Sequence, residues 1–183
     1  MIDKHSLSTN SGKRFNPTKA QIADILIEDI AHALSLICRA NGHLNLFYSI
    51  AQHSINCAKE AEARGHSVRI QMACLLHDAS EAYIGDVISP LKRQLPDYLV
   101  FENNLQEIIF KSLNIPKVSL EEEKIVKEID NCLLYHEFKI LHGDELLDFV
   151  PEIHIDVENV EIHHSVIEAQ FLHLYYHYFS ALG

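Results

Sequence analysis

The stretch Leu75-Leu76-His77-Asp78-Ala79-Ser80-Glu81 decides how this chain folds, because an apolar helical run is followed directly by a histidine and two carboxylates. The helical pattern covers about residues 68–82 and predicts a buried helix. Buried polar groups need partners, since leaving them without one costs free energy. A neutral imidazole and an ionised carboxylate both bind divalent metals, and the ion offsets the desolvation of the acid. His77 and Asp78 are therefore candidate metal ligands.

Two further polar residues complete a ligand set. His53 lies in an upstream helical run, and Asp130 lies beside the apolar stripe of a helix far downstream. With His77 and Asp78 they supply two nitrogens and two oxygens from three separate segments. The His-Asp dipeptide alone favours a hydrogen-bonded pair on a solvated helix, so the prediction of a metal site depends on the two distant residues.

In these residues the chain resembles the HD-domain phosphohydrolases, and more narrowly their small single-domain 5'-deoxynucleotidase branch. The resemblance covers about residues 14–141. The first motif reads Gln52-His53-Ser54, and the second reads His77-Asp78-Ala79-Ser80-Glu81-x-x-x-Gly85-Asp86-x-x-x-Pro90-x-Lys92. The resemblance implies an all-α, compact single-domain HD-type helical bundle with the metal ligands His53, His77, Asp78 and Asp130.

The resemblance also implies roles for four residues near these ligands. Glu81, three residues after Asp78, is expected to deprotonate a water nucleophile or to protonate the leaving oxygen, and Asp86 to assist it. Arg39 and Lys92 are expected to bind phosphate, because phosphoryl transfer needs cations beside the nonbridging oxygens. The simpler interpretations are an exposed helix acid for Glu81, a loop cap for Asp86, and a cation stabilised at a helix C-terminus for Arg39.

One position departs from the family pattern. At Ala40 the family has a tryptophan that faces the sugar, and this chain contains no tryptophan. The missing ring implies a roomier pocket for a deoxynucleoside mono- or triphosphate or a nucleotide analogue. Residues 12–17 and 42–48 resemble small phage and bacterial relatives that act on deoxynucleoside triphosphates or analogues, including enzymes of nucleoside-antibiotic biosynthesis.

The expected function is a metal-dependent phosphohydrolase that removes phosphate from a nucleotide by attack of metal-activated water at phosphorus. One divalent ion is expected, because HD proteins with two metals use extra histidines and residues 79–129 contain none. The mixed ligand set does not distinguish Mg, Mn, Co, Fe and Zn, and substrate phosphates can bring a second Mg. The alternatives are a cyclic-nucleotide or alarmone phosphodiesterase on the same scaffold, and a non-catalytic helical ligand-binding or dimerisation module.

The composition is that of a globular protein and narrows the classes of partner. The chain has 183 residues, enough for one domain with a substantial core. Its net charge of −11 disfavours nucleic acid, whereas the resemblance implies a small-molecule nucleotide as partner. No apolar run reaches the length of a membrane span or forms a signal core, so no membrane contact is expected. Four cysteines without CxxC spacing indicate reduced thiols in the cytoplasm.

Helical periodicity dominates the chain and predicts an all-α fold without strands. The helices are expected at about 27–40, 47–64, 68–82, 96–113, 120–138 and 165–180. Within a single domain 1–183, residues 1–20 are expected to form an extended N-terminal arm and residues 142–162 an irregular excursion. The aromatic residues of the last helix favour core packing, or the surface of a homodimer.

Overall fold

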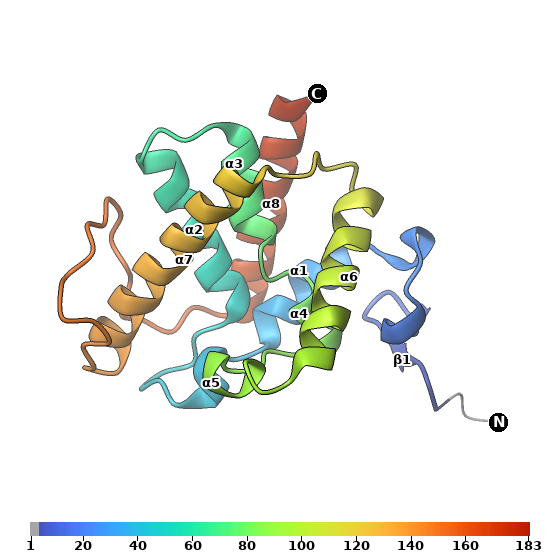
Figure 1. Cartoon of the computed structure of the whole chain (residues 1–183), viewed down its shortest axis with the longest axis horizontal. Coiled ribbons are helices and arrows are strands. Elements are labelled where there is room, and N and C mark those ends of the chain that lie inside the picture. Colours follow the sequence, from blue (N-terminus) through green and yellow to red (C-terminus); the bar gives the residue numbers. More distant parts are fainter. Residues whose placement is uncertain (1–3) are drawn as a thin grey trace.

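Helices make up most of the structure, a computed structural model that describes residues 4–183, and the expected all-α class is confirmed (Figure 1). The helices are α1 (Ile27–Leu36), α2 (Ile50–Ala63), α3 (Val68–Leu76), α4 (Glu81–Ile84), α5 (Ser89–Lys92), α6 (Pro96–Ser112), α7 (Leu120–Leu141) and α8 (His164–Leu182). Short 3-10 turns lie at Pro17–Lys19, Ile22–Asp24 and Arg39–Gly42.

The core forms where α2 packs against α1, α3, α7 and α8, with α8 also lying against α1 and α3. Ile30 and Leu34 of α1, Leu75 of α3 and Phe171 of α8 are completely buried there. Each such side chain contributes about 1.5–3 kcal/mol by leaving water. This apolar packing fixes the relative positions of α2, α3 and α7, and the predicted metal ligands lie on α2, on α7 and in the turn after α3.

The start of α7 has the capping box that its sequence predicts. The Ser119 hydroxyl accepts a hydrogen bond from the Glu122 backbone N–H at 3.3 Å, and the Glu122 carboxylate accepts one from the Ser119 N–H at 2.7 Å. Both backbone groups would otherwise lack partners at a helix start. The cap fixes where the long helix that carries Asp130 begins.

The N-terminal arm contains a small sheet that the periodicity did not predict. Strands β1 (Leu7–Ser8) and β2 (Arg14–Phe15) pair in antiparallel fashion, with Leu7 opposite Phe15. Phe15 is fully buried and stacks on Tyr83 with ring centroids 4.1 Å apart. Burial of this ring explains why the arm folds back onto the helices. The first three residues of the expected arm lie outside the described part of the chain.

The expected single helix over 68–82 is wrong in its second half. The chain leaves the helix after Leu76 and re-enters one only at Glu81. The side-chain amide of Gln106, on α6, accepts a hydrogen bond from the Ser80 N–H at 3.0 Å and donates to the Leu76 carbonyl at 2.5 Å. These are the two backbone groups that a continuous helix would join, so the inserted amide stabilises the break.

The first helix also ends earlier than expected, which corrects the position of Arg39. Beyond Leu36 the chain becomes extended and pairs with the segment before α2: the Arg39 N–H donates to the Tyr48 carbonyl at 2.8 Å, and the Ile50 N–H donates to the Ile37 carbonyl at 3.0 Å. Arg39 is therefore placed by this extended pairing, and a helix C-terminus does not stabilise it.

The turn after Arg39 is conformationally unusual. Ala40 and Asn41 have φ values of 54° and 50°, and Gly42 continues the left-handed path with φ of 77°. Residues with a Cβ rarely adopt this region, since the carbon crowds the following carbonyl. The turn is thus a strained segment beside Arg39.

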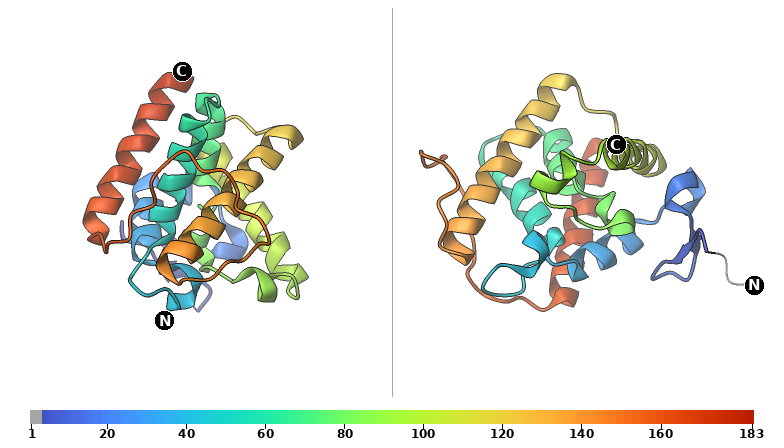
Figure 2. Two further views of the ribbon diagram at one scale, coloured as in Figure 1. Left: turned by 90° about the vertical axis from the view of Figure 1, so that its left-hand side faces the viewer. Right: turned by 60° about the horizontal axis from the view of Figure 1, so that its bottom comes forward.

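Residues 143–163 connect α7 to α8 without helix or strand and pass along α2 and α7 (Figure 2). The buried carboxylate of Glu60, on α2, accepts hydrogen bonds from the His154 N–H at 2.9 Å and from His154 Nδ1 at 3.0 Å. These hydrogen bonds attach the middle of the 143–163 connection to α2. In residues 4–183 no helix combines the length and hydrophobicity needed to cross a bilayer.

Candidate metal centre

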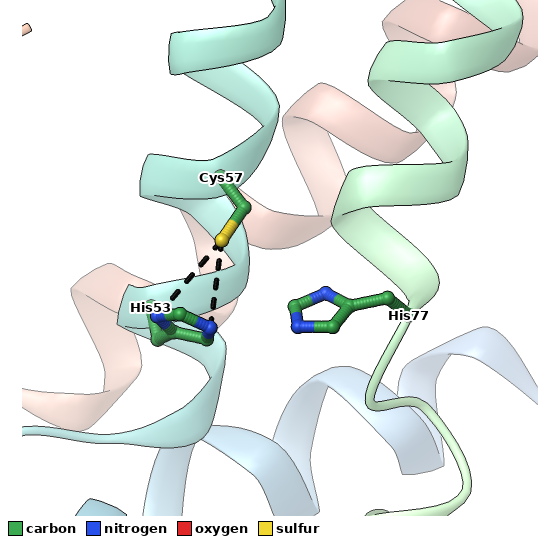
Figure 3. Close-up of side chains that lie close together, drawn as sticks. All are labelled: His53, Cys57 and His77. Carbon is green, nitrogen blue, oxygen red and sulfur yellow. Dashed lines mark hydrogen bonds between the residues drawn. The ribbon is translucent and has the colours of Figure 1, made fainter. Parts of the chain in front are cut away.

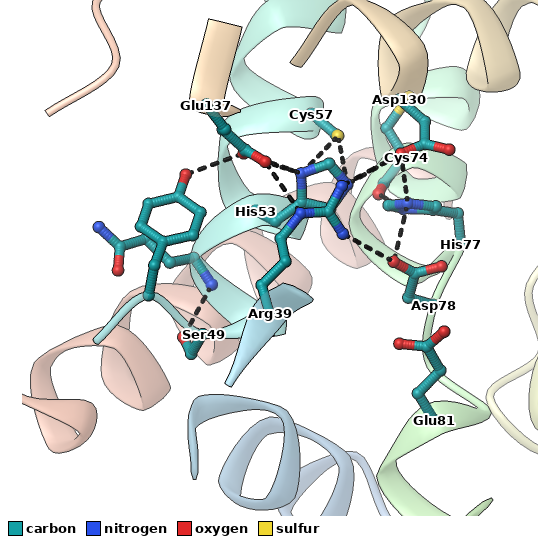
Figure 4. A network of polar contacts seen from close by, with 12 residues as sticks. Arg39, Ser49, His53, Cys57, Cys74, His77, Asp78, Glu81, Asp130 and Glu137 are labelled. Carbon is teal, nitrogen blue, oxygen red and sulfur yellow. Dashed lines mark hydrogen bonds and ion pairs between the residues drawn. The ribbon is translucent and has the colours of Figure 1, made fainter. Parts of the chain in front are cut away.

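Four predicted ligands come together between three segments of the core (Figure 4). His53 lies on α2, His77 and Asp78 in the turn after α3, and Asp130 on α7. His53 Nε2 is 3.1 Å and His77 Nε2 is 3.8 Å from Asp130 Oδ1, and His77 Nε2 is 3.1 Å from Asp78 Oδ2. Their mutual distances are those of groups that could share one cation; their role as ligands stays a prediction.

His77 meets the chemical requirement for a metal ligand. Its Nδ1 lies 2.7 Å from the Cys74 carbonyl, which can only accept, so Nδ1 carries a proton. Its Nε2 is buried and makes no hydrogen bond despite the nearby carboxylates. A buried nitrogen without a hydrogen bond, facing two carboxylates, is suited to a divalent cation, so the donor set fits such an ion.

The charges around this nitrogen are strongly coupled. Burial lowers the pKa of His77, but Asp78 and Asp130 outweigh burial and raise it well above its ordinary value. Burial raises the pKa of Asp78 and of Asp130, but the histidines outweigh burial and hold both below their usual range. Both carboxylates are therefore ionised at neutral pH. A cation placed between them would compete with the His77 proton for the same negative charge.

Cys57 joins the cluster, although the sequence predicted only a reduced thiol there. One ligand atom each from His53, Cys57 and His77 lies within 4.8 Å of the others (Figure 3). The Cys57 Sγ is 3.4 Å from His53 Nε2. Burial raises the pKa of the Cys57 thiol well above its ordinary value, so it faces the site as a neutral group. Its position four residues after His53 puts both on one helix face, which the sequence could have revealed.

Glu137 is a second residue that the sequence reasoning missed. It lies on α7, and its fully buried carboxylate is 2.8 Å from His53 Nδ1. Oε2 accepts from Arg39 Nε at 2.9 Å and Oε1 from the Tyr48 hydroxyl at 2.9 Å (Figure 4). Burial raises the pKa of Glu137, but His53 and Arg39 outweigh burial and lower it. The seven-residue spacing from Asp130, two helical turns, was the available signal.

Arg39 and Lys127 balance the negative charge of Asp130. A terminal nitrogen of Arg39 lies 3.7 Å from Asp130 Oδ1, and another lies 4.0 Å from Asp78 Oδ2. Lys127 Nζ lies 2.7 Å from Asp130 Oδ2. The structure thus brings Arg39 beside the predicted metal ligands, and its guanidinium carries the donors that match phosphate oxygens.

A cavity of about 600 Å³ opens directly in front of these groups. Its volume falls within the range of small-molecule sites. The lining carries both charges: acidic side chains lie beside basic ones from several segments. Its charged residues are Arg39, Asp78, Glu81, Asp86, Lys92, Arg93, Lys127 and Asp130. Every predicted catalytic and phosphate-binding residue therefore faces this cavity.

Glu81 is an acid of the cavity whose pKa is strongly raised. Burial, followed by the charges of Asp78 and Asp86, raises its pKa to about 9. Its Oε1 is 3.2 Å from Lys92 Nζ, whereas its buried Oε2 has no hydrogen-bond partner. Lys92 in turn pairs with Glu102 at 2.7 Å. Glu81 thus holds a proton at neutral pH in a place open to the cavity.

Asp86 and the turn before it complete the acidic side of the cavity. Burial raises the pKa of Asp86, which follows Gly85 at the end of α4. Gly85 has φ of 77°, and its carbonyl accepts a hydrogen bond from the Tyr98 hydroxyl at 2.8 Å. A glycine is needed there because residues with a Cβ rarely adopt this φ. The glycine turn places Asp86 beside Glu81.

Comparison with known proteins shows that the chain is similar to two uncharacterised bacterial proteins. It is 42% identical over 112 residues to the uncharacterised protein YfdR of Escherichia coli, covering 61% of this chain and 60% of YfdR. It is 36% identical over 114 residues to an uncharacterised protein of Rhodobacter capsulatus, covering 59% of this chain and 58% of that protein. The chain therefore matches less than two thirds of either relative. No protein-family model matches it.

Proposed function

We propose that this protein is an HD-type, metal-dependent phosphohydrolase that removes phosphate from a nucleotide. The observation that supports the proposal is that two imidazoles and two carboxylates converge behind a cavity with charged walls. Among these groups, the Nε2 of His77 is buried and makes no hydrogen bond. A divalent ion held by His53, His77, Asp78 and Asp130 would polarise a phosphoryl oxygen and acidify water.

In this proposal Glu81 transfers a proton during the reaction, as the acid that protonates the leaving oxygen or as the base that deprotonates water. Hydrolysis forms a bond from a water oxygen to phosphorus and breaks the bond from phosphorus to the leaving oxygen. The water gives up a proton, and the leaving oxygen takes one. Glu81 is protonated at neutral pH in the metal-free protein, so it suits the donor role, and a cation near Asp78 would lower its pKa toward that of a base.

Arg39 and Lys92 supply the positive charge that phosphoryl groups need. Arg39 presents terminal guanidinium nitrogens toward Asp78 and Asp130 and lines the cavity, so a phosphate near the ligands would lie within its reach. Lys92 is paired with Glu81 and Glu102, which places its charge beside the proposed proton donor. These cations would offset charge on the nonbridging oxygens.

The size of the cavity supports a nucleotide as the substrate. Ala40 and Asn41 line one wall and no large aromatic residue stands at position 40, so the wall leaves space for a sugar and base. The proposed substrates are deoxynucleoside mono- or triphosphates or their analogues. We place the reaction in the cytoplasm, because the four cysteines are unpaired, as expected in a reducing compartment.

The test is a panel of nucleoside mono- and triphosphates, cyclic nucleotides and dinucleotides, each assayed with Mg²⁺, Mn²⁺, Co²⁺ and Zn²⁺. Phosphate release from a mono- or triphosphate is expected, and it should disappear in Asp78→Asn. Glu158→Gln, a change in the exposed connection, is the matched control and should keep full activity. Cleavage of cyclic nucleotides or dinucleotides alone would favour a phosphodiesterase. The absence of any activity that depends on Asp78 would favour a binding module.

A further inference from the structure

Two functional groups of the proposed site share one buried carboxylate. Glu137 Oε1 and Oε2 lie 2.8 and 3.0 Å from His53 Nδ1, and Oε2 also accepts a hydrogen bond from Arg39 Nε at 2.9 Å. The Glu137 side chain is completely buried. Burying a charged carboxylate destabilises the fold unless its oxygens accept hydrogen bonds. Here the side chains of His53, Arg39 and Tyr48 supply them.

We propose that Glu137 is a positioning residue that presents His53 to the metal and Arg39 to the phosphate. The inference rests on the proposed function, since it names what holds two of that site's groups in place. Glu137 makes no direct contact with the reaction in this proposal. It acts through the imidazole and the guanidinium.

The effect on His53 follows from hydrogen-bond chemistry. An ionised carboxylate only accepts, so the ring nitrogen that faces Glu137 must carry the proton. Nε2 is then the ring nitrogen that faces Asp130, 3.1 Å away, and the other ligands, and an ion bound there would replace any proton that Nε2 shares with Asp130. Carboxylates behind metal-bound histidines fix the ring in this way and make the nitrogen a stronger donor.

The effect on Arg39 follows from the shape of the guanidinium. Its Nε edge is taken by Glu137, which leaves the terminal nitrogens to point toward Asp78 and Asp130. The planar group offers donors along more than one edge, so one anchored edge orients the others. Glu137 therefore sets the direction in which Arg39 meets an anion in the cavity.

Tyr48 provides a matched control on the same carboxylate. Its hydroxyl donates to Glu137 Oε1 at 2.9 Å and accepts from Asn56 Nδ2 at 2.8 Å. Tyr48→Phe removes one donor to Glu137 but leaves the contacts with His53 and Arg39. Glu137→Gln keeps the shape of the side chain but replaces one acceptor oxygen with a donor.

The experiment measures Zn²⁺ binding by calorimetry and the protonation of His53 by nitrogen-15 NMR. Glu137→Gln should bind Zn²⁺ about 10- to 100-fold more weakly than the natural protein, whereas Tyr48→Phe should change the affinity only about threefold or less. In the Zn²⁺-loaded natural protein, His53 should carry its proton on Nδ1 and bind the ion through Nε2. This second measurement needs no variant, so it holds even if Glu137→Gln does not fold.

Three results would overturn the inference. Zn²⁺ bound through His53 Nδ1, or a folded Glu137→Gln protein with undiminished affinity, would remove the role of Glu137 and leave the proposed function intact. A natural protein that binds none of Zn²⁺, Mn²⁺, Co²⁺ and Mg²⁺ would overturn the proposed function together with this inference. Metal binding by the natural protein therefore tells the failure of this inference apart from the failure of the proposed function.

Discussion

The Gln106 side chain replaces a helix hydrogen bond of Ser80. Its amide oxygen accepts from the Ser80 N–H at 3.0 Å, while its amide nitrogen donates to the carbonyl of Leu76, where the Ser80 N–H would otherwise bind. The polypeptide can therefore leave the helix after Leu76 while the Ser80 N–H and the Leu76 carbonyl both keep partners. This break turns His77 and Asp78 toward the other predicted ligands.

Replacing Gln106 with leucine should destabilise the fold by about 1–3 kcal/mol, because the Ser80 N–H loses its partner and the Leu76 carbonyl keeps only the Ala79 N–H. It should also weaken metal binding, since the turn that holds Asp78 is no longer stabilised. Urea denaturation and calorimetry measure the two effects. The control is Asn103→Leu, an exposed change on the same helix. Equal stability of the Gln106 variant and the natural protein would show that the break does not depend on the inserted amide.

Substituting a predicted ligand and substituting the predicted proton donor should have different effects on metal binding and turnover. Asp130→Asn removes a charged ligand and should lower both metal affinity and turnover to background. Glu81→Gln should keep the metal bound and reduce turnover about 10²- to 10⁴-fold, the range for loss of an acid or base. Metal content and phosphate release are measured on the same preparations. Loss of metal in Glu81→Gln would make Glu81 a ligand instead.

Glu81 should also destabilise the metal-free protein in a pH-dependent way. Its pKa is about 9 in the fold and ordinarily 4.5, so between these values the unfolded chain releases a proton that the folded chain retains. Stability is therefore lost as pH rises from 4.5 toward 9. Glu81→Gln should be more stable than the natural protein by about 1 kcal/mol or more at pH 8, with no difference near pH 4.

The measurement is urea denaturation in EDTA at several pH values, with the exposed change Glu158→Gln as control. A stability difference that stays constant from pH 4 to pH 8 would mean that Glu81 ionises normally in the fold.

Glu60 should show the opposite pH dependence. Burial raises the pKa of Glu60, but hydrogen bonds from Arg64 and His154 outweigh burial and lower it below its ordinary value of 4.5. The ionised carboxylate therefore stabilises the fold at pH values above 4.5. Glu60→Gln should cost about 1–3 kcal/mol at pH 7. The cost should shrink as the pH falls below 4.5, because the natural side chain then takes up a proton and loses the same advantage.

The same change should release the connection between α7 and α8. Limited proteolysis within 143–163 should become faster in Glu60→Gln, as followed by mass spectrometry of the fragments. Unchanged cleavage would indicate that the contacts with α7, such as Cys132 Sγ with the Glu152 carbonyl at 3.2 Å, hold this segment without Glu60.

The helices could be predicted from local apolar spacing, and the ligand set from the His-Asp motif together with the resemblance to the HD-domain phosphohydrolases. Apolar spacing marks the buried faces, and Asp130 beside an apolar stripe is unusual enough to suggest a partner. The structure brings His53, His77, Asp78 and Asp130 within a few ångströms, whereas what they bind stays a prediction.

The remaining features depend on contacts between distant parts of the chain. Gln106 is 26 residues from Ser80, so nothing near the motif could reveal the break. Arg39 was assigned to a helix end because the extended pairing with Tyr48 has no periodic pattern. Glu137 lies two helical turns after Asp130 and so on the same helix face, but a glutamate at such a position usually indicates a solvated helix face.

The arginine and lysine beside Asp130 have a consequence for how the protein acquires an ion. Arg39 and Lys127 already place positive charge beside Asp130, so folding of the bundle should not require a divalent cation, unlike a zinc finger. In the proposed function, the ion would therefore bind to a protein that is already folded. If the proposed centre binds an ion, one preparation should accept different ions in turn, and each would displace the His77 proton and the contacts of Arg39 and Lys127 with the carboxylates.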